Sequence, residues 1–217
     1  PGNGIGNGRA AALLLADGGA RVLVVDKKPD FANKTVEMID RNGGKAISIE
    51  ADVTNEADCE LIVTKALSTW GRLDVLDNNV GIGSRGTVVS EEYEKWKHVM
   101  KVNLDSMFLM SKKCIPAMKE SSNRGSIINI SSDLGLIGPN QKLYEIKGKR
   151  PDSQPVKPVT YSVIKAGLIG LTRYLSTYWT DLNVRCNAIC PGGIENNQPE
   201  EFIKKVSELI PMGRLAK

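Results

Sequence analysis

The sequence predicts an α/β protein in which helices cover both faces of a doubly wound, mostly parallel sheet. Short β-branched and apolar runs alternate with helical stretches along the chain. These runs are almost continuously apolar, as strands buried on both faces of a parallel sheet are. The chain has 217 residues, of which 41% are hydrophobic and 25% are charged, which is enough for one sizeable core. We therefore expect a single domain over residues 1–217.

The first half of the chain alternates helix and strand. An alanine- and leucine-rich run over residues 10–16 predicts a helix, which Gly18 and Gly19 end. The β-branched run 21–26 predicts the strand that follows. By the same reasoning, two further helices and two further strands are expected in turn, the helices over residues 31–41 and 56–70 and the strands over 45–51 and 73–76.

The second half continues this alternation around one long interruption. Ser90 has the side chain of a helix N-cap and acidic residues follow it, so we expect a helix from residue 90 to about residue 119. Residues 138–160 contain four prolines and predict a long loop, a feature that is usually functional or disordered. The remaining expected elements are strands over 126–130 and 184–190 and helices over 161–178 and 199–209.

Composition excludes several classes of function. The net charge of +4 contains no long basic block, and three Phe, five Tyr and three Trp are too scattered for a base-stacking surface, so no nucleic-acid partner is expected. Four cysteines without a CxxC pair and a single histidine, His98, predict no metal site. No apolar run approaches the roughly 20 residues that cross a bilayer, so we expect a cytoplasmic protein without a membrane role.

The glycine-rich start of the chain predicts a dinucleotide site. Gly2, Gly6 and Gly8 precede the first expected helix, where backbone amides can approach a phosphate at the positive helix terminus. Asp26 ends the next strand, 20 residues beyond Gly6, at the spacing of an acid that accepts from a ribose 2′-hydroxyl. An ordinary flexible loop is the alternative, but it does not account for Asp26.

Asp26 also bears on which dinucleotide is bound. Its negative charge would repel the additional phosphate of NADP, which favours NAD. Lys27 and Lys28 follow directly and leave NADP possible.

Six motifs occur in the order found in the short-chain dehydrogenase/reductase family. The chain resembles this family over nearly its whole length, which implies a Rossmann-like fold and an NAD(P)-dependent oxidoreductase that acts on secondary alcohols or ketones. The motifs are Gly2-x-x-x-Gly6-x-Gly8, Asp77-Asn78-Asn79-Val80-Gly81, Asn103, Ser131-Ser132, Tyr161-x-x-x-Lys165 and Cys190-Pro191-Gly192-Gly193.

The predicted catalytic residues are Asn103, Ser132, Tyr161 and Lys165. Tyr161 and Lys165 are four residues apart on one helix and share a face, a spacing that on its own also suits an ordinary helix surface. A tyrosine side chain ordinarily titrates near pH 10, and a neighbouring ammonium favours its phenolate, so Tyr161 is the expected general acid/base. Ser132 follows a strand and can donate to the substrate oxygen. By resemblance, Asn103 bends its helix and anchors a water that relays protons through Lys165.

The resemblance also assigns contacts with the cofactor beyond the glycine loop. The pair Asp52-Val53 resembles one that touches the adenine ring, although it suits a helix entry equally well. The other residues expected to contact the cofactor are Asn79, Gly81, Tyr161, Lys165, Pro191 and Gly192.

The sequence departs from the family in two respects. Relatives begin with a strand before the glycine loop and end with a further strand, so we expect this sequence to be part of a longer protein. The interval from Ser132 to Tyr161 is 29 residues, about twice that of relatives, so residues 138–160 form an insertion beside the substrate. We hypothesise that its excess of basic residues helps to recognise an acidic substrate such as a sugar acid or nucleotide-linked sugar; a solvated surface loop is the alternative. The basic residues are Lys142, Lys147, Lys149, Arg150 and Lys157, against Glu145 and Asp152.

Two other functions remain open. Epimerase or dehydratase action on a nucleotide sugar is disfavoured by the short chain, and a silent dinucleotide-binding regulator is disfavoured by the intact catalytic motifs. The resemblance further implies a homodimer or homotetramer formed through the helix over 90–119 and the helix after Tyr161. Apolar residues on the first of these helices are sufficient for an inner face and a second contact.

Overall fold

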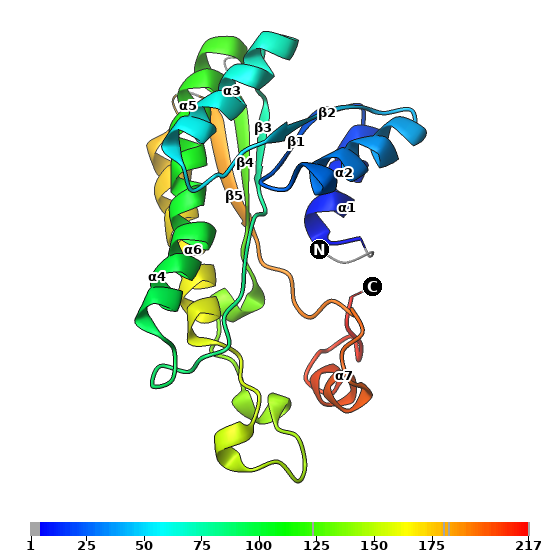
Figure 1. The fold of residues 1–217 in the computed structure, drawn as a ribbon, viewed down its shortest axis with the longest axis vertical. Coiled ribbons are helices and arrows are strands. Elements are labelled where there is room, and N and C mark those ends of the chain that lie inside the picture. The colour runs from blue at the N-terminus through cyan, green and yellow to red at the C-terminus, as the bar shows by residue number, and fades with distance from the viewer. Residues whose placement is uncertain (1–4, 123, 180, 182, 217) are drawn as a thin grey trace. The chain divides into compact units, whose positions relative to one another are not determined.

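A computed structural model describes residues 5–122, 124–179, 181 and 183–216 (Figure 1). They group into two compact units built from discontinuous segments. The first unit comprises Pro1–Val80, Asp105–Ile127 and Trp179–Arg185, and the second comprises Gly81–Leu104, Ile128–Tyr178 and Cys186–Lys217. Strands β4 (Gly125–Ile130) and β5 (Val184–Ile189) begin in the first unit and continue into the second.

The amino-terminal part of the first unit is a βαβ arrangement. Strand β1 pairs in parallel with β2, with Arg21 opposite Lys45 and Asp26 opposite Glu50. Helix α1 packs on β1, and α2 packs on both strands. The bounds are α1 Asn7–Asp17, β1 Arg21–Asp26, α2 Pro29–Arg41 and β2 Lys45–Glu50.

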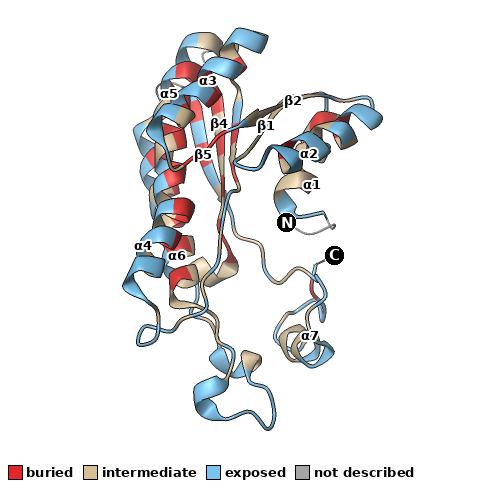
Figure 2. Cartoon of the chain, in the orientation of Figure 1, coloured by how far each residue is buried: buried red, intermediate tan, exposed pale blue. Residues whose placement is uncertain are grey.

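The rest of the first unit has a helical core. Helix α3 (Glu56–Trp70) lies beside α5 (Ser106–Ser122), and buried residues of both helices are visible in Figure 2. The Asn55 side chain accepts from the first-turn amides of α3, and Gly71 ends the helix at a φ of 72°, where a residue without Cβ is favoured. Burial raises the pKa of the Cys114 thiol on α5 to about 12, which keeps it protonated in this core.

The second unit carries a long helix beside the ends of two strands. Helix α4 packs against α6, and α6 packs against a short 3₁₀ turn, Asp133–Gly135. Strand β3 (Val75–Asn78) belongs to the first unit, and the strand order of the three-stranded sheet is β3-β4-β5. The helices are α4 Tyr93–Met100, α6 Val159–Tyr178 and α7 Glu200–Ser207, with a π-helical turn over Lys101–Asp105.

The α/β class with parallel strand pairing is confirmed, whereas several expected element bounds differ by one to three residues. Two of these differences have a clear local cause. The strand expected over 73–76 is β3 at Val75–Asn78, because the Leu73 amide instead donates to Ser121 Oγ. The helix expected from Ser90 begins at Tyr93 with Glu92 at its N-cap position, because Ser90 Oγ accepts from the Thr87 amide in a preceding turn.

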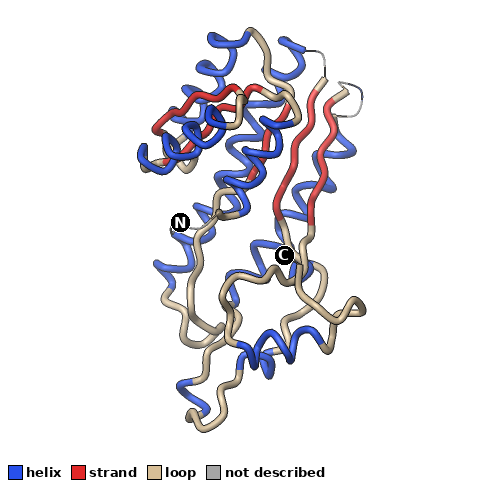
Figure 3. The backbone as a smooth tube through the Cα atoms, turned by 90° about the vertical axis from the view of Figure 1, so that its right-hand side faces the viewer, coloured by secondary structure: helices blue, strands red, loops and turns tan. Residues whose placement is uncertain are grey.

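The insertion over residues 138–160 is largely loop, as expected, with two short 3₁₀ turns, Gln141–Tyr144 and Pro151–Ser153 (Figure 3). Its last residues are already helical, because α6 begins at Val159. Two glutamine side chains fasten the loop internally. Gln141 pairs with the backbone of Lys157, and Gln154 pairs with the backbone of Ile146.

Candidate active site

Tyr161 and Lys165 lie in the first two turns of α6. The Tyr161 amide donates to the carbonyl of Pro158 (3.1 Å), which fixes the start of the helix. Lys165 Nζ donates to the carbonyl of Ile130 (2.6 Å), at the end of β4, and lies 5.7 Å from the centroid of the Tyr161 ring. Burial lowers the pKa of Lys165, and the charge of nearby Lys157 lowers it further. The predicted tyrosine–lysine pair is therefore brought together beside the end of a strand.

Ser132 follows β4 and is buried. Its Oγ donates to Asp133 Oδ1 (2.8 Å) and accepts from the Leu134 amide (3.2 Å). The neighbouring Ser131 Oγ donates to the carbonyl of Lys165 (2.7 Å), which ties this strand end to α6. Ser132 must turn its hydroxyl away from Asp133 before it can donate to a substrate oxygen.

Asn103 lies at the centre of the π-helical turn and is buried. Its Nδ2 donates to the carbonyls of Val99 (2.7 Å) and Ile82 (3.0 Å), and its Oδ1 accepts from the Ile82 amide (3.1 Å). A Cβ on Gly81 would lie 2.7 Å from Asn103 Oδ1, so Gly81 allows this amide to approach the backbone closely. The helix is thus irregular where a bend was expected, and the water relay stays a prediction.

Residues of the first unit leave room for a phosphate at the start of α1. Gly6 occupies the N-cap position with extended backbone and contributes no side chain to cap the helix. A Cβ on Gly8 would lie 3.4 Å from the Asn79 side chain, so a larger residue would crowd this position. Helix first-turn amides beside glycines suit an anion such as the cofactor's pyrophosphate. Gly2, also expected here, lies outside the described residues.

The expected adenosine contacts lie after β1 and β2. Asp26 ends β1, and its Oδ1 accepts from the Lys28 amide (2.9 Å), which holds the carboxylate at the strand end. Asp52 Oδ1 accepts from the Thr54 amide (2.9 Å). Val53 is buried and its carbonyl accepts from Cys59 Sγ (3.3 Å), so its side chain belongs to the core of this unit.

Asp77 on β3 opens the motif over residues 77–81 but was not among the residues expected to contact the cofactor. Its Oδ2 accepts from Asn79 Nδ2 (3.4 Å), whereas its Oδ1 is buried without a hydrogen-bond partner among the described residues. Burial raises the pKa of Asp77, and the bond from Asn79 opposes that shift. An acid within an apolar strand run was the signal that could have identified it.

Pro191 and Gly192 follow β5 and lie against the Ser132 segment. The Pro191 carbonyl accepts from the Asp133 amide (3.1 Å). Gly192 is exposed, and a Cβ there would lie 3.7 Å from Asp133 Oδ2. Two loops that follow neighbouring strands are thereby held together.

The insertion over residues 138–160 contacts Tyr161. Its position in the sequence predicted a place beside the substrate but did not identify the contacting residue. Lys157 Nζ lies 3.7 Å from the centroid of the Tyr161 ring. Tyr144 is partly buried with its ring 5.2 Å from that of Phe202 on α7. Burial raises the pKa of Tyr144, and the charges of Tyr161 and Asp133 raise it further, so this side chain is also close to the site.

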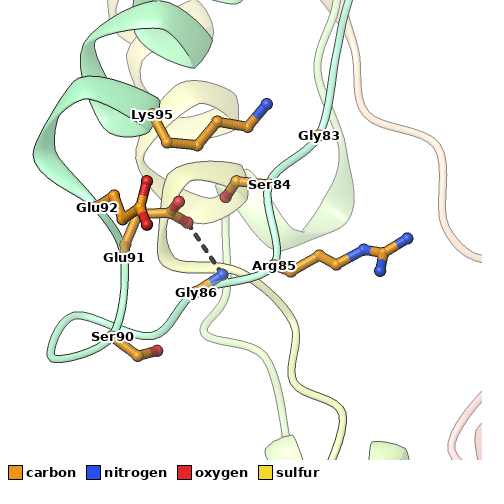
Figure 4. Close-up of a pocket in the computed structure, with 8 residues that line it drawn as sticks. All are labelled: Gly83, Ser84, Arg85, Gly86, Ser90, Glu91, Glu92 and Lys95. Carbon is orange, nitrogen blue, oxygen red and sulfur yellow. Dashed lines mark hydrogen bonds between the residues drawn. The ribbon is translucent and has the colours of Figure 1, made fainter.

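A cavity of about 430 Å³ lies in the segment between β3 and α4 (Figure 4). The Gly86 amide donates to Glu91 Oε2 (3.0 Å) across it, while Arg85 extends away from the acidic residues. None of the four predicted catalytic residues lines it, so it is not assigned as the reaction site. It is lined by Gly83, Ser84, Arg85, Gly86, Ser90, Glu91, Glu92 and Lys95.

The described ranges, residues 5–122, 124–179, 181 and 183–216, also bear on metal binding and membrane insertion. Within them, no three histidine, cysteine, aspartate or glutamate side chains gather in a geometry that could hold a metal ion. None of the helices described combines the length and apolar character that crossing a membrane requires.

Comparisons of sequence and of overall fold with known proteins indicate one family of enzymes. The family described as short chain dehydrogenase matches residues 2–144, and the family described as enoyl-(acyl carrier protein) reductase matches residues 153–217. An oxidoreductase of Thermotoga maritima is 38% identical over 226 residues, covering 100% of this chain and 82% of the relative. Cyclohexanol dehydrogenase of an Acinetobacter species is 33% identical over 216 residues, covering 99% and 79%. A solved chain described as a short-chain dehydrogenase/reductase from Burkholderia xenovorans has a TM-score of 0.83 and 31% identity, covering 100% and 80%.

Proposed function

The chain belongs to the short-chain dehydrogenase/reductase family of oxidoreductases, and on that premise we propose that it transfers a hydride between NAD(P) and a secondary alcohol or ketone. The observation that carries this proposal is the Tyr161–Lys165 pair on α6, with Lys165 Nζ bonded to the carbonyl at the end of β4. Relatives named as alcohol and sugar dehydrogenases, such as cyclohexanol dehydrogenase and glucose 1-dehydrogenase 2 of Bacillus subtilis, support the substrate class.

The protein's part in this reaction is proton transfer and orientation. In the oxidative direction Tyr161 accepts the proton of the substrate hydroxyl. The carbon that bears this hydroxyl loses its hydrogen as a hydride to the cofactor, which leaves a carbonyl. The ammonium of Lys165 stabilises the phenolate that begins this step. Ser132 donates to the substrate oxygen and holds it beside the tyrosine. The bound nicotinamide supplies the redox chemistry as acceptor or donor of the hydride.

We propose that the cofactor is held by the loops that follow the strands and by the start of α6. Gly2, Gly6 and Gly8 bind the pyrophosphate, Asp26 binds the ribose, and Asp52 and Val53 border the adenine. Asn79, Gly81, Pro191 and Gly192, with Tyr161 and Lys165, contact the remainder. The glycine at the N-cap position of α1 and the close approach of Gly8 to Asn79 support the first of these assignments.

NAD is the favoured cofactor because the Asp26 carboxylate can accept from two ribose hydroxyls but repels a 2′-phosphate. Asp26→Ser should lower kcat/KM with NAD about tenfold and raise it with NADP. The measurement is kcat/KM with each cofactor for the same substrate. Equal use of both cofactors by the unmodified protein would contradict the preference.

Turnover tests the function directly. Full-length protein is incubated with NAD or NADP and a panel of neutral alcohols, sugars and acidic sugars, with nicotinamide absorbance followed over time. The matched control is Tyr161→Phe, which keeps the ring but removes the hydroxyl. Turnover that falls about 10³-fold in the control is the expected result. Cofactor binding without turnover of any compound would instead favour a regulator.

We further propose a cytoplasmic homodimer or homotetramer. Phe108 on α5 is 54% exposed and Tyr174 on α6 is 60% exposed, and large apolar side chains at such exposure suit a contact between subunits. Light scattering after size exclusion should give a mass of two or four chains. A monomer mass would contradict the assembly.

A further inference from the structure

The basic residues of the insertion are not equivalent. Arg150 forms an ion pair with Asp152, and Lys149 is exposed. Lys157, in contrast, is half-buried and its Nζ lies over the face of the Tyr161 ring at 3.7 Å from the centroid. One cation of this loop, Lys157, therefore lies over the ring of the proposed acid/base residue Tyr161. Lys149 faces solvent, and Arg150 faces an acid of the loop.

Hydrogen bonds from the Gln141 side chain hold the backbone of Lys157 in place. Its amide donates to Gln141 Oε1 (2.9 Å), and its carbonyl accepts from Gln141 Nε2 (3.1 Å). Pro158 follows it, and the Val159 amide donates to the carbonyl of Gly86 (3.1 Å). A side chain that starts from so fixed a backbone has fewer positions to lose on binding.

Within the part of the chain that the structure describes, the Lys157 ammonium is not paired with a carboxylate. Among the described residues it has no hydrogen-bond or ion-pair partner, and the acid whose charge acts on it is Asp133. Asp133 already accepts from the Ser132 hydroxyl and the Leu134 amide. The Lys157 side chain is half-buried, so its charge has lost part of its hydration, and this burial lowers the pKa of Lys157. A partly desolvated cation that touches a ring but no ionised partner gains from an anion placed beside it.

We propose that Lys157 binds an anionic group of the substrate, so that this enzyme acts on short hydroxy acids or oxo acids whose carboxylate lies close to the reacting carbon. The inference rests on the proposed function, because it takes Tyr161 as the residue at the reacting oxygen. Lys157 and Tyr161 are in contact, so one small molecule can place an anionic group on the first and its hydroxyl on the second. Tyr144 and Phe202, which pack together near this site, offer an apolar wall to its carbon chain.

Pairs of substrates that differ only in charge test the proposal. The probes are 2-hydroxybutanoate and 3-hydroxybutanoate, each beside its methyl ester, with oxidation followed by nicotinamide absorbance. Lys157→Met should raise KM for the acid that is turned over about tenfold relative to KM for its ester. Any effect of the lost charge on the Tyr161 phenolate should change kcat equally for the two substrates. Lys157→Arg should recover most of the loss. Lys149→Met, an exposed lysine of the same loop, should change either KM by less than about twofold.

Two results would overturn the proposal. An equal effect of Lys157→Met on acid and ester would mean that the lysine acts on Tyr161 rather than on a carboxylate. An equal effect of Lys149→Met and Lys157→Met on the acid would mean that the loop's overall charge steers anions without a specific contact.

A binding measurement separates this inference from the proposed function. Butanoate, which cannot be oxidised at a hydroxyl, is titrated calorimetrically into full-length Tyr161→Phe protein with NAD present. Adding the Lys157→Met substitution should raise the Kd for butanoate at least about tenfold. Absence of butanoate binding, or binding that is unchanged by the substitution, would refute the carboxylate site. Absence of turnover with every alcohol, with charge-dependent binding intact, would refute the proposed function alone.

Discussion

Helix α6 and the insertion before it both present an ammonium group to Tyr161, but they hold it in different ways. Lys165 is placed by the four-residue spacing of a regular helix, and its Nζ is anchored on a strand-end carbonyl at 2.6 Å. Lys157 is placed by a loop whose attachment depends on the side chain of Gln141. The first lysine lies 5.7 Å from the ring centroid and the second 3.7 Å.

The difference indicates how the two tasks of the site are divided. Backbone hydrogen bonds keep α6 in place when one side chain is changed, which suits the proton-transfer groups that the reaction always requires. A loop on a rigid scaffold can vary its side chains without disturbing that framework, which suits substrate selection. Substitutions in the two regions should therefore have separable effects on chemistry and on recognition.

The largest expected effect lies at the strand end beside α6. Ser132→Ala removes the predicted donor to the substrate oxygen and should lower kcat/KM about 10²-fold for charged and neutral substrates alike. Ser131→Ala is the matched control, because Ser131 Oγ is bonded to the carbonyl of Lys165 and has no predicted contact with substrate. It should lower the free energy of unfolding by about 1 kcal/mol and leave kcat nearly unchanged. Equal kinetic losses in both variants would contradict the assignment.

The next effect is on stability at the irregular turn that carries Asn103. Gly81→Ala places a Cβ 2.7 Å from Asn103 Oδ1 and forces this buried amide to move. Overpacking of this kind should lower the free energy of unfolding by about 2 kcal/mol and the Tm by about 4–8 °C. Gly83→Ala, with nothing within 4 Å of the added atom, is the control and should leave the Tm unchanged in thermal unfolding.

A smaller effect is expected where the insertion is fastened. Gln141→Ala removes both hydrogen bonds to the backbone of Lys157, which loosens the cation without removing it. KM for a hydroxy acid should rise about threefold, while kcat for its ester is unchanged. Gln154→Ala, which loosens the outer turn of the same loop, should have a weaker effect on KM. A larger rise in KM for Gln154→Ala than for Gln141→Ala would contradict the inference that Gln141 positions Lys157.

The smallest effect concerns an ion pair that belongs to neither region. The Arg72 guanidinium lowers the pKa of Asp74, so the ionised pair stabilises the fold above the usual aspartate pKa and this contribution is lost as the pH falls below about 4. Both side chains are about 40% exposed, so Asp74→Asn should cost only about 0.5 kcal/mol at pH 7. Denaturant unfolding at pH 7 and pH 3 measures the difference, which should shrink at pH 3. A difference that grew on acidification would contradict the assigned sign.

Elements with local signals were predictable from the sequence. Strand β1 and helix α3 have the bounds that their residue patterns predict, because a β-branched run ends at Asp26 and because Gly71 provides a helix stop within the same segment. The tyrosine–lysine pair was predictable for the same reason, since its spacing lies within a single helix.

Features that depend on distant partners were not predictable. Asn103 interrupts its helix while bonded to Ile82, which is 21 residues away, and Ser90 is withdrawn from the helix start by a turn with Thr87. The charge of the insertion was visible in the sequence, but the contact of Lys157 with Tyr161 depends on the Gln141 attachment, which spans 16 residues of irregular loop. Contacts of this kind follow from tertiary structure rather than from local pattern.

One comparison tests the division between α6 and the insertion most directly. The value of kcat/KM is measured for a hydroxy acid and its methyl ester in the unmodified protein, Lys165→Met and Lys157→Met. Lys165→Met should lower both values by a similar factor, about 10²-fold, because it removes the charge that stabilises the phenolate. Lys157→Met should lower the value for the acid about tenfold more than the value for the ester. A Lys157→Met variant that loses both substrates equally, or a Lys165→Met variant that discriminates between them, would contradict the account.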